Sequence, residues 1–199
     1  MSEGAARRVL VPLAEGFEEI EAITVIDVLR RAGVDVVVAG LTAGPIKASR
    51  GVVVVPDVLL DAVVDAPFDM VVLPGGMPGA KTLGSDARIK QVLARARTEN
   101  RWIAAICAAP AMVLEPAGFL TNVPATGHPS FADRLPTYTG QRVLIHERLV
   151  LSQAPGTAIE FALELVRQLC GEAKAREVAA PMLARWDGWP EGKASPSRT

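Results

Sequence analysis

The stretch WIAAICAAP, residues 102–110, contains the pattern from which the fold can be predicted. Its first five residues, 102–106, are typical of a strand that is buried on both faces. Cys107, followed at once by small residues and a proline, predicts a sharp strand–turn–helix corner, with a helix over 108–115 that is interrupted near Pro116. A strand that leads directly into a helix is the repeating unit of a parallel sheet.

The same alternation of apolar strands and helices runs along most of the chain. Strands are predicted at 8–14, 34–40, 68–76 and 102–106, with a short strand or edge hairpin at 51–57 and paired strands at 142–154. Helices are predicted at 18–32, 86–99, 157–170 and 172–184. Strands with two buried faces favour a mainly parallel sheet covered on both sides, and right-handed connections then predict a doubly wound, three-layer α/β/α sandwich.

Length and composition limit the classes of protein and partner. The 199-residue chain predicts one domain over 1–184, followed by a Pro-, Gly- and Ser-rich flexible tail over 185–199. The formal charge of −1 gives no reason to expect nucleic acid or an anionic membrane as a partner. No apolar run is long enough to span a bilayer, and the first residues, MSEGAARR, lack the apolar stretch of a signal peptide. Two cysteines do not make a disulfide framework, so we expect a cytoplasmic protein.

Cys107 is the first candidate for chemistry. Ligands of open α/β sheets bind beyond the carboxyl ends of the strands, and Cys107 and the Gly75–Gly76 turn both fall there. Because a helix start favours a thiolate, the pKa of Cys107 is expected to be lowered, and the N–H groups of Gly75, Gly76 and Ala108 are placed to form an oxyanion hole. The alternative is that Cys107 only packs in the core. Cys170, at the end of an amphipathic helix, is predicted to be a core residue.

Three acidic residues open the first predicted helix. Helical geometry projects Glu18 and Glu21 onto its apolar face, with Glu19 toward the margin. An acid that faces the core must be paired or protonated, and a neutral carboxyl beside a thiolate can act as a general acid or base. The alternative is a helix start open to water, where acids complement the helix dipole. Ile20 and Ile23 on the polar face predict contact with another surface, for which a homodimer is the simplest partner.

The two histidines predict different roles. His128 lies in the Gly/Pro loop ATGHPSF, where side chains often take part in chemistry, and a Cys/His pair is a common way to activate a thiol. His146 lies within a predicted strand and is interpreted as structural. Two histidines and one corner cysteine do not make a zinc site, so neither a metal nor another cofactor is expected.

Five segments together resemble the DJ-1 branch of the ThiJ/PfpI superfamily. They are, in chain order, GFEEIEAITVIDVLRRAG, VVLPGGMPGA, AAICAAPAMVL, GHPSF and APGTAIEFALELV. The resemblance covers about residues 7–184. It implies a flavodoxin-like sandwich of the class I glutamine-amidotransferase type, usually assembled as a homodimer.

The resemblance also implies roles for individual residues. It makes Cys107 the reactive cysteine and Glu21 the acid that hydrogen-bonds it. Implied neighbours of the pocket are Gly76 and Ala108 through their N–H groups, His128 at the border, Glu18 as a second acid, and Arg50 as a basic residue near the cysteine. Implied positions near the pocket or the dimer seam are Arg31, Pro155 and Pro181.

The first function that the resemblance implies is a glyoxalase III or deglycase. Such an enzyme acts on methylglyoxal, glyoxal or their early adducts without glutathione or a metal. The Cys107 thiolate would attack the aldehyde, and either Glu21 or His128 would move the proton that leads to a 2-hydroxy acid.

Two other functions stay open. One is a sensor of oxidative stress or a chaperone in which Cys107 oxidises to the sulfinate. Ala48 and Val55 replace further cysteines of the human branch, which leaves Cys107 as the sensor. The other is a cysteine peptidase or amidase, which Ala108 disfavours because peptidase-like members have histidine directly after the cysteine.

Overall fold

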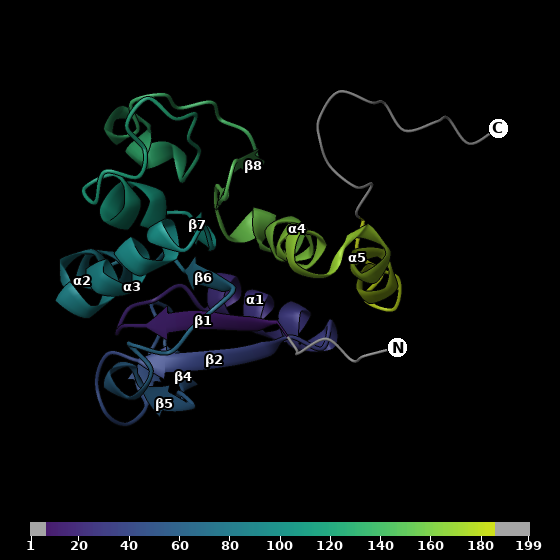
Figure 1. The fold of residues 1–199 in the computed structure, drawn as a ribbon, viewed down its shortest axis with the longest axis horizontal. Helices are drawn as coiled ribbons and strands as arrows, with labels where there is room; N and C mark the ends of the chain where they lie inside the picture. Colours follow the sequence, from purple (N-terminus) through teal and green to yellow (C-terminus); the bar gives the residue numbers. More distant parts are fainter. Residues whose placement is uncertain (1–6, 186–199) are drawn as a thin grey trace.

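The computed structural model describes residues 7–185. Its centre is a seven-stranded sheet with the order β5-β2-β1-β6-β7-β9-β8 (Figure 1). The strands are β1 (Arg8–Leu13), β2 (Asp35–Gly40), β5 (Val58–Leu59), β6 (Met70–Leu73), β7 (Trp102–Ile106), β8 (Val143–His146) and β9 (Leu149–Ser152). Neighbouring strands are parallel except β8, which pairs antiparallel with β9. The predicted, mainly parallel sheet is therefore confirmed.

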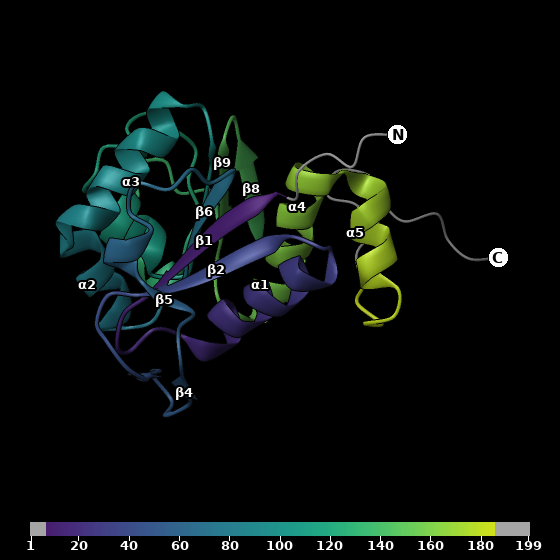
Figure 2. The same cartoon turned by 60° about the horizontal axis from the view of Figure 1, so that its bottom comes forward.

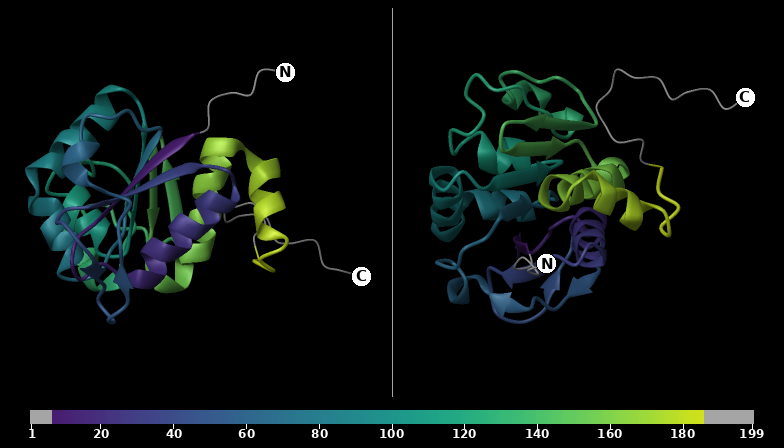
Figure 3. Two further views of the ribbon diagram at one scale, coloured as in Figure 1. Left: turned by 90° about the horizontal axis from the view of Figure 1, so that it is seen from below. Right: turned by 45° about the vertical axis from the view of Figure 1, so that its right-hand side comes forward.

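Helices cover both faces of this sheet. One layer contains α1 (Glu19–Arg31), α4 (Ala158–Cys170) and α5 (Glu172–Ala179), and the other contains α2 (Gly79–Ser85) and α3 (Ala87–Thr98). Figure 2 shows the sheet between the two layers, and Figure 3 shows α1 beside α4 from two further directions. The molecule is the flavodoxin-like α/β/α sandwich that the sequence predicts.

The strands are apolar throughout because both of their faces are buried. In β1, Val9 and Val11 pack into the core beneath α1 and α4, whereas Leu10 packs into the core beneath α3. All three side chains are fully buried. This alternation removes the apolar/polar pattern of a half-exposed strand and leaves a continuous apolar run.

Three local elements differ from the sequence predictions. The helix α2 is not predicted, because its sequence GAKTLGS contains two glycines, which are poor helix formers. The segment expected to be a helix over 108–115 forms a single π-helical turn, Pro110–Leu114. The hairpin expected at 51–57 consists of β3 (Ile46–Lys47) and β4 (Val53–Val54), which pair with each other outside the main sheet.

Cys170 is exposed, so its prediction as a core residue is wrong: Leu169 is the last buried position of α4, and Cys170 ends the helix in solvent. The predicted tail lies outside the described residues apart from Arg185. Among residues 7–185, no helix has the length and apolar character needed to cross a membrane.

Candidate active site

Cys107 occupies a sharp corner directly after β7. Its backbone has a φ of 64°, a left-handed conformation that is uncommon and strained for a residue with a side chain. Hydrogen bonds hold this conformation from both sides: the Cys107 N–H donates to Ser152 O at 3.0 Å, and Cys107 O accepts from the His128 N–H at 2.8 Å. The corner therefore has the strand-to-turn geometry of a nucleophile elbow at the carboxyl edge of the sheet.

Glu21 reaches the same point from the first turn of α1. It is fully buried, as the helical-face argument predicts. Its Oε2 accepts a hydrogen bond from the Gly75 N–H at 2.8 Å. Its Oε1 is buried without a hydrogen-bond partner among residues 7–185. The carboxyl lies close enough to the Cys107 thiol for each group to shift the pKa of the other.

Gly75 allows Glu21 and Cys107 to approach each other. A Cβ atom at position 75 would lie 2.7 Å from both Cys107 Cβ and Glu21 Oε2, and 3.0 Å from the Ala108 nitrogen. Gly76 has a φ of 87°, and a Cβ there would lie 2.5 Å from Gly16 O. The N–H groups of Gly76 and Ala108 lie close enough to the Cys107 sulfur to lower the pKa of its thiol. One N–H group of the turn and one of the corner thus act on the sulfur, and the Gly75 N–H donates to Glu21.

Burial raises the pKa of both reactive groups. The pKa of Glu21 rises from 4.5 to about 7, chiefly through desolvation. Desolvation, followed by the charge and hydrogen bond of Glu21, raises the pKa of Cys107 to about 12, while the Gly76 and Ala108 N–H groups lower this pKa. The expectation that a helix start alone lowers the thiol pKa is wrong. The element that directly follows Cys107 is the short π-helical turn Pro110–Leu114 instead of a regular α-helix, so burial and Glu21 outweigh the helix dipole.

Glu18 and Arg50 lie beside this pair. Glu18 caps α1, and its Oε2 accepts from the Glu21 N–H at 2.8 Å. Burial raises the pKa of Glu18, and the charge of Glu18 in turn raises the pKa of Glu21. The charge of Arg50 acts on Glu18, whereas its guanidinium donates to Ser49 O at 3.4 Å. In the described part of the chain, no hydrogen bond joins Arg50 to Cys107.

His128 meets Cys107 through its main chain. Its ring Nδ1 accepts from the Ser130 N–H at 3.2 Å and lies 2.7 Å from Ser130 Oγ, so the ring caps the turn that follows. Between residues 7 and 185, no hydrogen bond links the ring to the Cys107 sulfur. Of the two groups expected to move a proton, the structure places Glu21 against the thiol.

The three remaining implied residues form no hydrogen bond or ion pair with Cys107 in the described part of the chain. Arg31 lies ten residues beyond Glu21, roughly 15 Å along α1, and pairs with Asp27 at 2.7 Å. Its implied position near the pocket or the dimer seam stays a prediction. Pro155 opens the short turn after β9, at the carboxyl edge of the sheet, and Pro181 is exposed in the turn after α5.

Glu19 has a larger structural role than its marginal place on the helical face suggests. It is buried, and its carboxylate accepts from the Arg50 N–H at 2.8 Å and from Ser49 Oγ at 3.0 Å. These bonds hold the segment that carries Arg50 against the start of α1. Periodicity contains no signal for this role, because the partners are about 30 residues apart in the sequence.

Comparison with known proteins places this geometry in a family. Residues 7–168 match the model of the DJ-1/PfpI family. DJ-1 homolog A of Arabidopsis thaliana is 42% identical over 184 residues, which are 90% of this chain and 47% of the relative. The chain thus spans about half the length of that relative.

Two further relatives match over most of their own length. The glutathione-independent glyoxalase DJR-1.2 of Caenorhabditis elegans is 36% identical over 178 residues, 87% of this chain and 94% of the relative. The solved structure of oxidized DJ-1 from Toxoplasma gondii superposes with a TM-score of 0.89 at 41% identity, covering 91% of this chain and 100% of that one. The family match, these identities and the shared fold together show that the chain belongs to the DJ-1/PfpI family, within its DJ-1 branch.

Proposed function

We propose that the protein is a glyoxalase of the glutathione-independent type, which converts methylglyoxal, glyoxal or their early adducts through Cys107. The observation that carries this proposal is the direct contact between the Cys107 thiol and the buried Glu21 carboxyl at a strained corner. The name of the worm relative, a glutathione-independent glyoxalase, supports the same reaction class.

The reactive form carries its proton on Glu21 and its negative charge on the sulfur. Two N–H groups, of Gly76 and Ala108, stabilise charge on the sulfur, whereas one N–H group reaches the Glu21 carboxylate. Glu21 raises the pKa of the thiol only while its carboxylate is charged. Once protonated, the carboxyl instead donates a hydrogen bond from Oε1 to the sulfur, which stabilises the thiolate. In this proposal the pair loses its first proton at or below the raised pKa of Glu21, about 7, because the sulfur gives up its proton more readily than the Glu21 carboxyl.

The reaction then needs only these two side chains and water. The Cys107 thiolate forms a bond to the aldehyde carbon, and the resulting alkoxide takes the proton of Glu21 to give a hemithioacetal. The Glu21 carboxylate removes the proton on that carbon and returns it to the neighbouring carbon, while the hydroxyl proton of the hemithioacetal moves to the neighbouring oxygen. These two transfers turn the hemithioacetal into a 2-hydroxy thioester. Water cleaves the thioester and releases lactate from methylglyoxal, with thiolate and acid restored.

The test is lactate formation by the intact protein. Wild type is expected to convert methylglyoxal to lactate without glutathione or an added metal, because the reaction consumes only water. Chiral chromatography or a lactate-specific assay follows the product. Wild type that forms no lactate would contradict the proposal.

A second candidate function rests on the same donors. The N–H groups of Gly76 and Ala108, with Glu21, suit a Cys107 sulfinate as well as a thiolate, and in a reducing cytoplasm such oxidation would report stress. If the protein is a sensor or chaperone, wild type forms no lactate and peroxide adds two oxygens to Cys107 in a mass spectrum. A peptidase or amidase lacks support, since Ala108 follows the cysteine and the His128 ring turns to Ser130.

We also propose that the protein forms a homodimer through α1. Ile20 and Ile23 are 54% and 40% exposed on the outer face of this helix, which is unusual for isoleucines of a helix that is otherwise well packed. Light scattering is expected to give about twice the monomer mass of 21.0 kDa. Ile23→Glu is expected to shift this mass toward the monomer, because the dimer would bury an unpaired charge. The matched variant Leu59→Glu, at an exposed position on β5, should leave the mass unchanged; equal masses for wild type and Ile23→Glu would contradict this interface.

A further inference from the structure

The amino edge of the sheet carries a cluster of charged residues away from the proposed active site. The strand order places β1, β6, β7 and β9 side by side. The residue that precedes each of these strands is charged: they are Arg7, Asp69, Arg101 and Arg148. Backbone hydrogen bonds hold this edge together, from the Trp102 N–H to Asp69 O at 3.1 Å and from the Ile103 N–H to Arg148 O at 2.9 Å. The fold therefore fixes three arginines at one edge.

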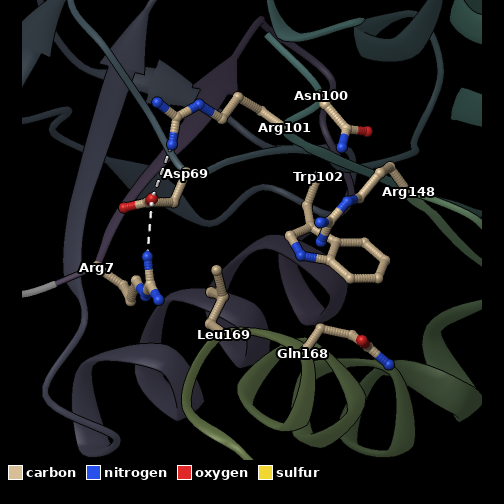
Figure 4. A pocket seen from close by; sticks show the side chains of 8 residues that line it. All are labelled: Arg7, Asp69, Asn100, Arg101, Trp102, Arg148, Gln168 and Leu169. Atoms are coloured by element: carbon tan, nitrogen blue, oxygen red, sulfur yellow. Dashed lines mark hydrogen bonds and ion pairs between the residues drawn. The ribbon is translucent and has the colours of Figure 1, made fainter.

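These residues line a pocket of about 210 Å³ (Figure 4). Asn100, Trp102 and the end of α4, with Gln168 and Leu169, complete its wall. The five residues of β7 separate it from Cys107 by roughly 16 Å. A second hollow of about 370 Å³ shares Asn100, Arg101 and Arg148 with this pocket. We call the hollow of about 210 Å³ the basic pocket. It is distinct from the proposed active site and adjoins the second hollow.

Hydrogen-bond donors outnumber acceptors in the basic pocket. Arg7 and Arg101 share one carboxylate oxygen, Asp69 Oδ1, at 3.3 and 3.2 Å, and Asp69 Oδ2 accepts from the Arg8 N–H. The Nε of Arg101 is buried without a hydrogen bond in the described chain, although a Glu99 oxygen lies 3.5 Å away. Three guanidiniums therefore face one carboxylate of the lining.

Arg148 has the fewest polar partners of the three arginines. Its guanidinium lies 4.8 Å from the centre of the Trp102 ring. It forms no ion pair with any residue between 7 and 185. Stacking on an indole leaves the edge of a guanidinium free to donate, so Arg148 is held in place with its donors available. Figure 4 shows Arg148 and Trp102 on one side of the pocket, opposite Arg7 and Asp69.

We propose that the basic pocket binds the phosphate group of a small phosphorylated molecule. Guanidiniums from three different strand starts approach from several directions, which suits a tetrahedral oxyanion better than a planar carboxylate with two oxygens. The volume admits a phosphate group, and the adjoining hollow gives room for an organic part. Arg148 and Arg101 donate to the phosphate oxygens, and Trp102 holds Arg148 in position.

Phosphate titration of the full chain, labelled with ¹⁵N and held at constant ionic strength, tests this site. The sequence contains three tryptophans, so a Trp102→Phe variant assigns the indole signal of Trp102. Inorganic phosphate is expected to shift that signal saturably, and Arg148→Gln to weaken binding about tenfold or more, as charge-assisted hydrogen bonds are lost. A dissociation constant of about 10 mM is the weakest that would still count as specific binding. If the Trp102 signal shows no saturable shift up to that phosphate concentration, the proposal is overturned.

Two control variants separate the site from general charge effects. Lys90→Gln removes the same charge from an exposed position on α3 and should leave the affinity within about twofold, because exposed charges are screened. An equal loss in Lys90→Gln and Arg148→Gln overturns the site. Cys107→Ser should bind phosphate as wild type does. Glycerol phosphate, titrated in parallel, distinguishes an organic phosphate, which would bind more tightly, from free phosphate.

Discussion

Cys107→Ser is expected to lower the rate of lactate formation from methylglyoxal by roughly 10³-fold or more, to the level without enzyme. A serine hydroxyl has nearly the same size but does not ionise near neutral pH, so no anion forms beside Glu21. The Gly76 and Ala108 donors, which in wild type stabilise the charged sulfur, then have only a neutral hydroxyl to bind. Stopped assays of lactate against time measure the effect.

The chain contains a matched control for this variant. Cys170 is exposed at the end of α4, remote from the carboxyl edge of the sheet, so Cys170→Ser should retain activity within about twofold. Far-ultraviolet circular dichroism establishes that both variants are folded. A Cys107→Ser protein that is folded and still forms lactate at the wild-type rate would exclude Cys107 as the nucleophile.

Gly75→Ala is expected to give the second large effect, because the added methyl enters the contact between the two reactive groups. Its Cβ would lie 2.7 Å from Cys107 Cβ and from Glu21 Oε2, both of which are held by the backbone or by burial. Relieving this clash requires a shift of the backbone, which we expect to lower the free energy of unfolding by about 1–3 kcal/mol. Displacing the thiol from the carboxyl by about 1 Å should also lower activity by about 10²-fold.

Gly156→Ala serves as the control for this variant. No atom of residues 7–185 lies within 4 Å of a Cβ built at Gly156, and its φ is not in the left-handed region. The substitution should leave activity unchanged and stability equal or slightly higher, since alanine restricts the unfolded chain. Denaturant unfolding and the lactate assay compare the two variants. If Gly75→Ala matches Gly156→Ala in both, the close approach of Cys107 and Glu21 at this glycine is contradicted.

The fold could be predicted well because its signals are local. The apolar run at 102–106 becomes β7, and the other long strands and helices begin and end close to their predicted limits, except that α5 ends at Ala179 instead of residue 184. The exceptions are elements that tertiary contacts determine. The two glycines of α2 weaken the helical signal of its sequence. The strands β3 and β4 pair with each other instead of joining the main sheet.

The site could be predicted only in part from sequence. Helical periodicity turns Glu21 toward the core, and the strand end places Cys107 at a corner, so both follow from local patterns. Periodicity gives no information on burial of the thiol, so the direction of its pKa shift was out of reach. The contacts of Glu19 with Ser49 and Arg50 and of Cys107 with Ser152 join distant segments, and no local signal marks them.

The central claim is that Cys107 and Glu21 together hold one proton near neutral pH, and that Glu21 carries it. The pKa to which Glu21 is raised, about 7, is then the upper limit for the loss of the first proton, and well below that pH the pair holds two protons and the sulfur is neutral. The direct measurement is the ultraviolet absorbance of the thiolate against pH, taken as the difference between wild type and Cys107→Ser. We predict that this absorbance rises with a midpoint at or below about pH 7. A thiolate signal that stays absent until pH approaches 12, the value for a thiol beside a charged Glu21, would contradict the account.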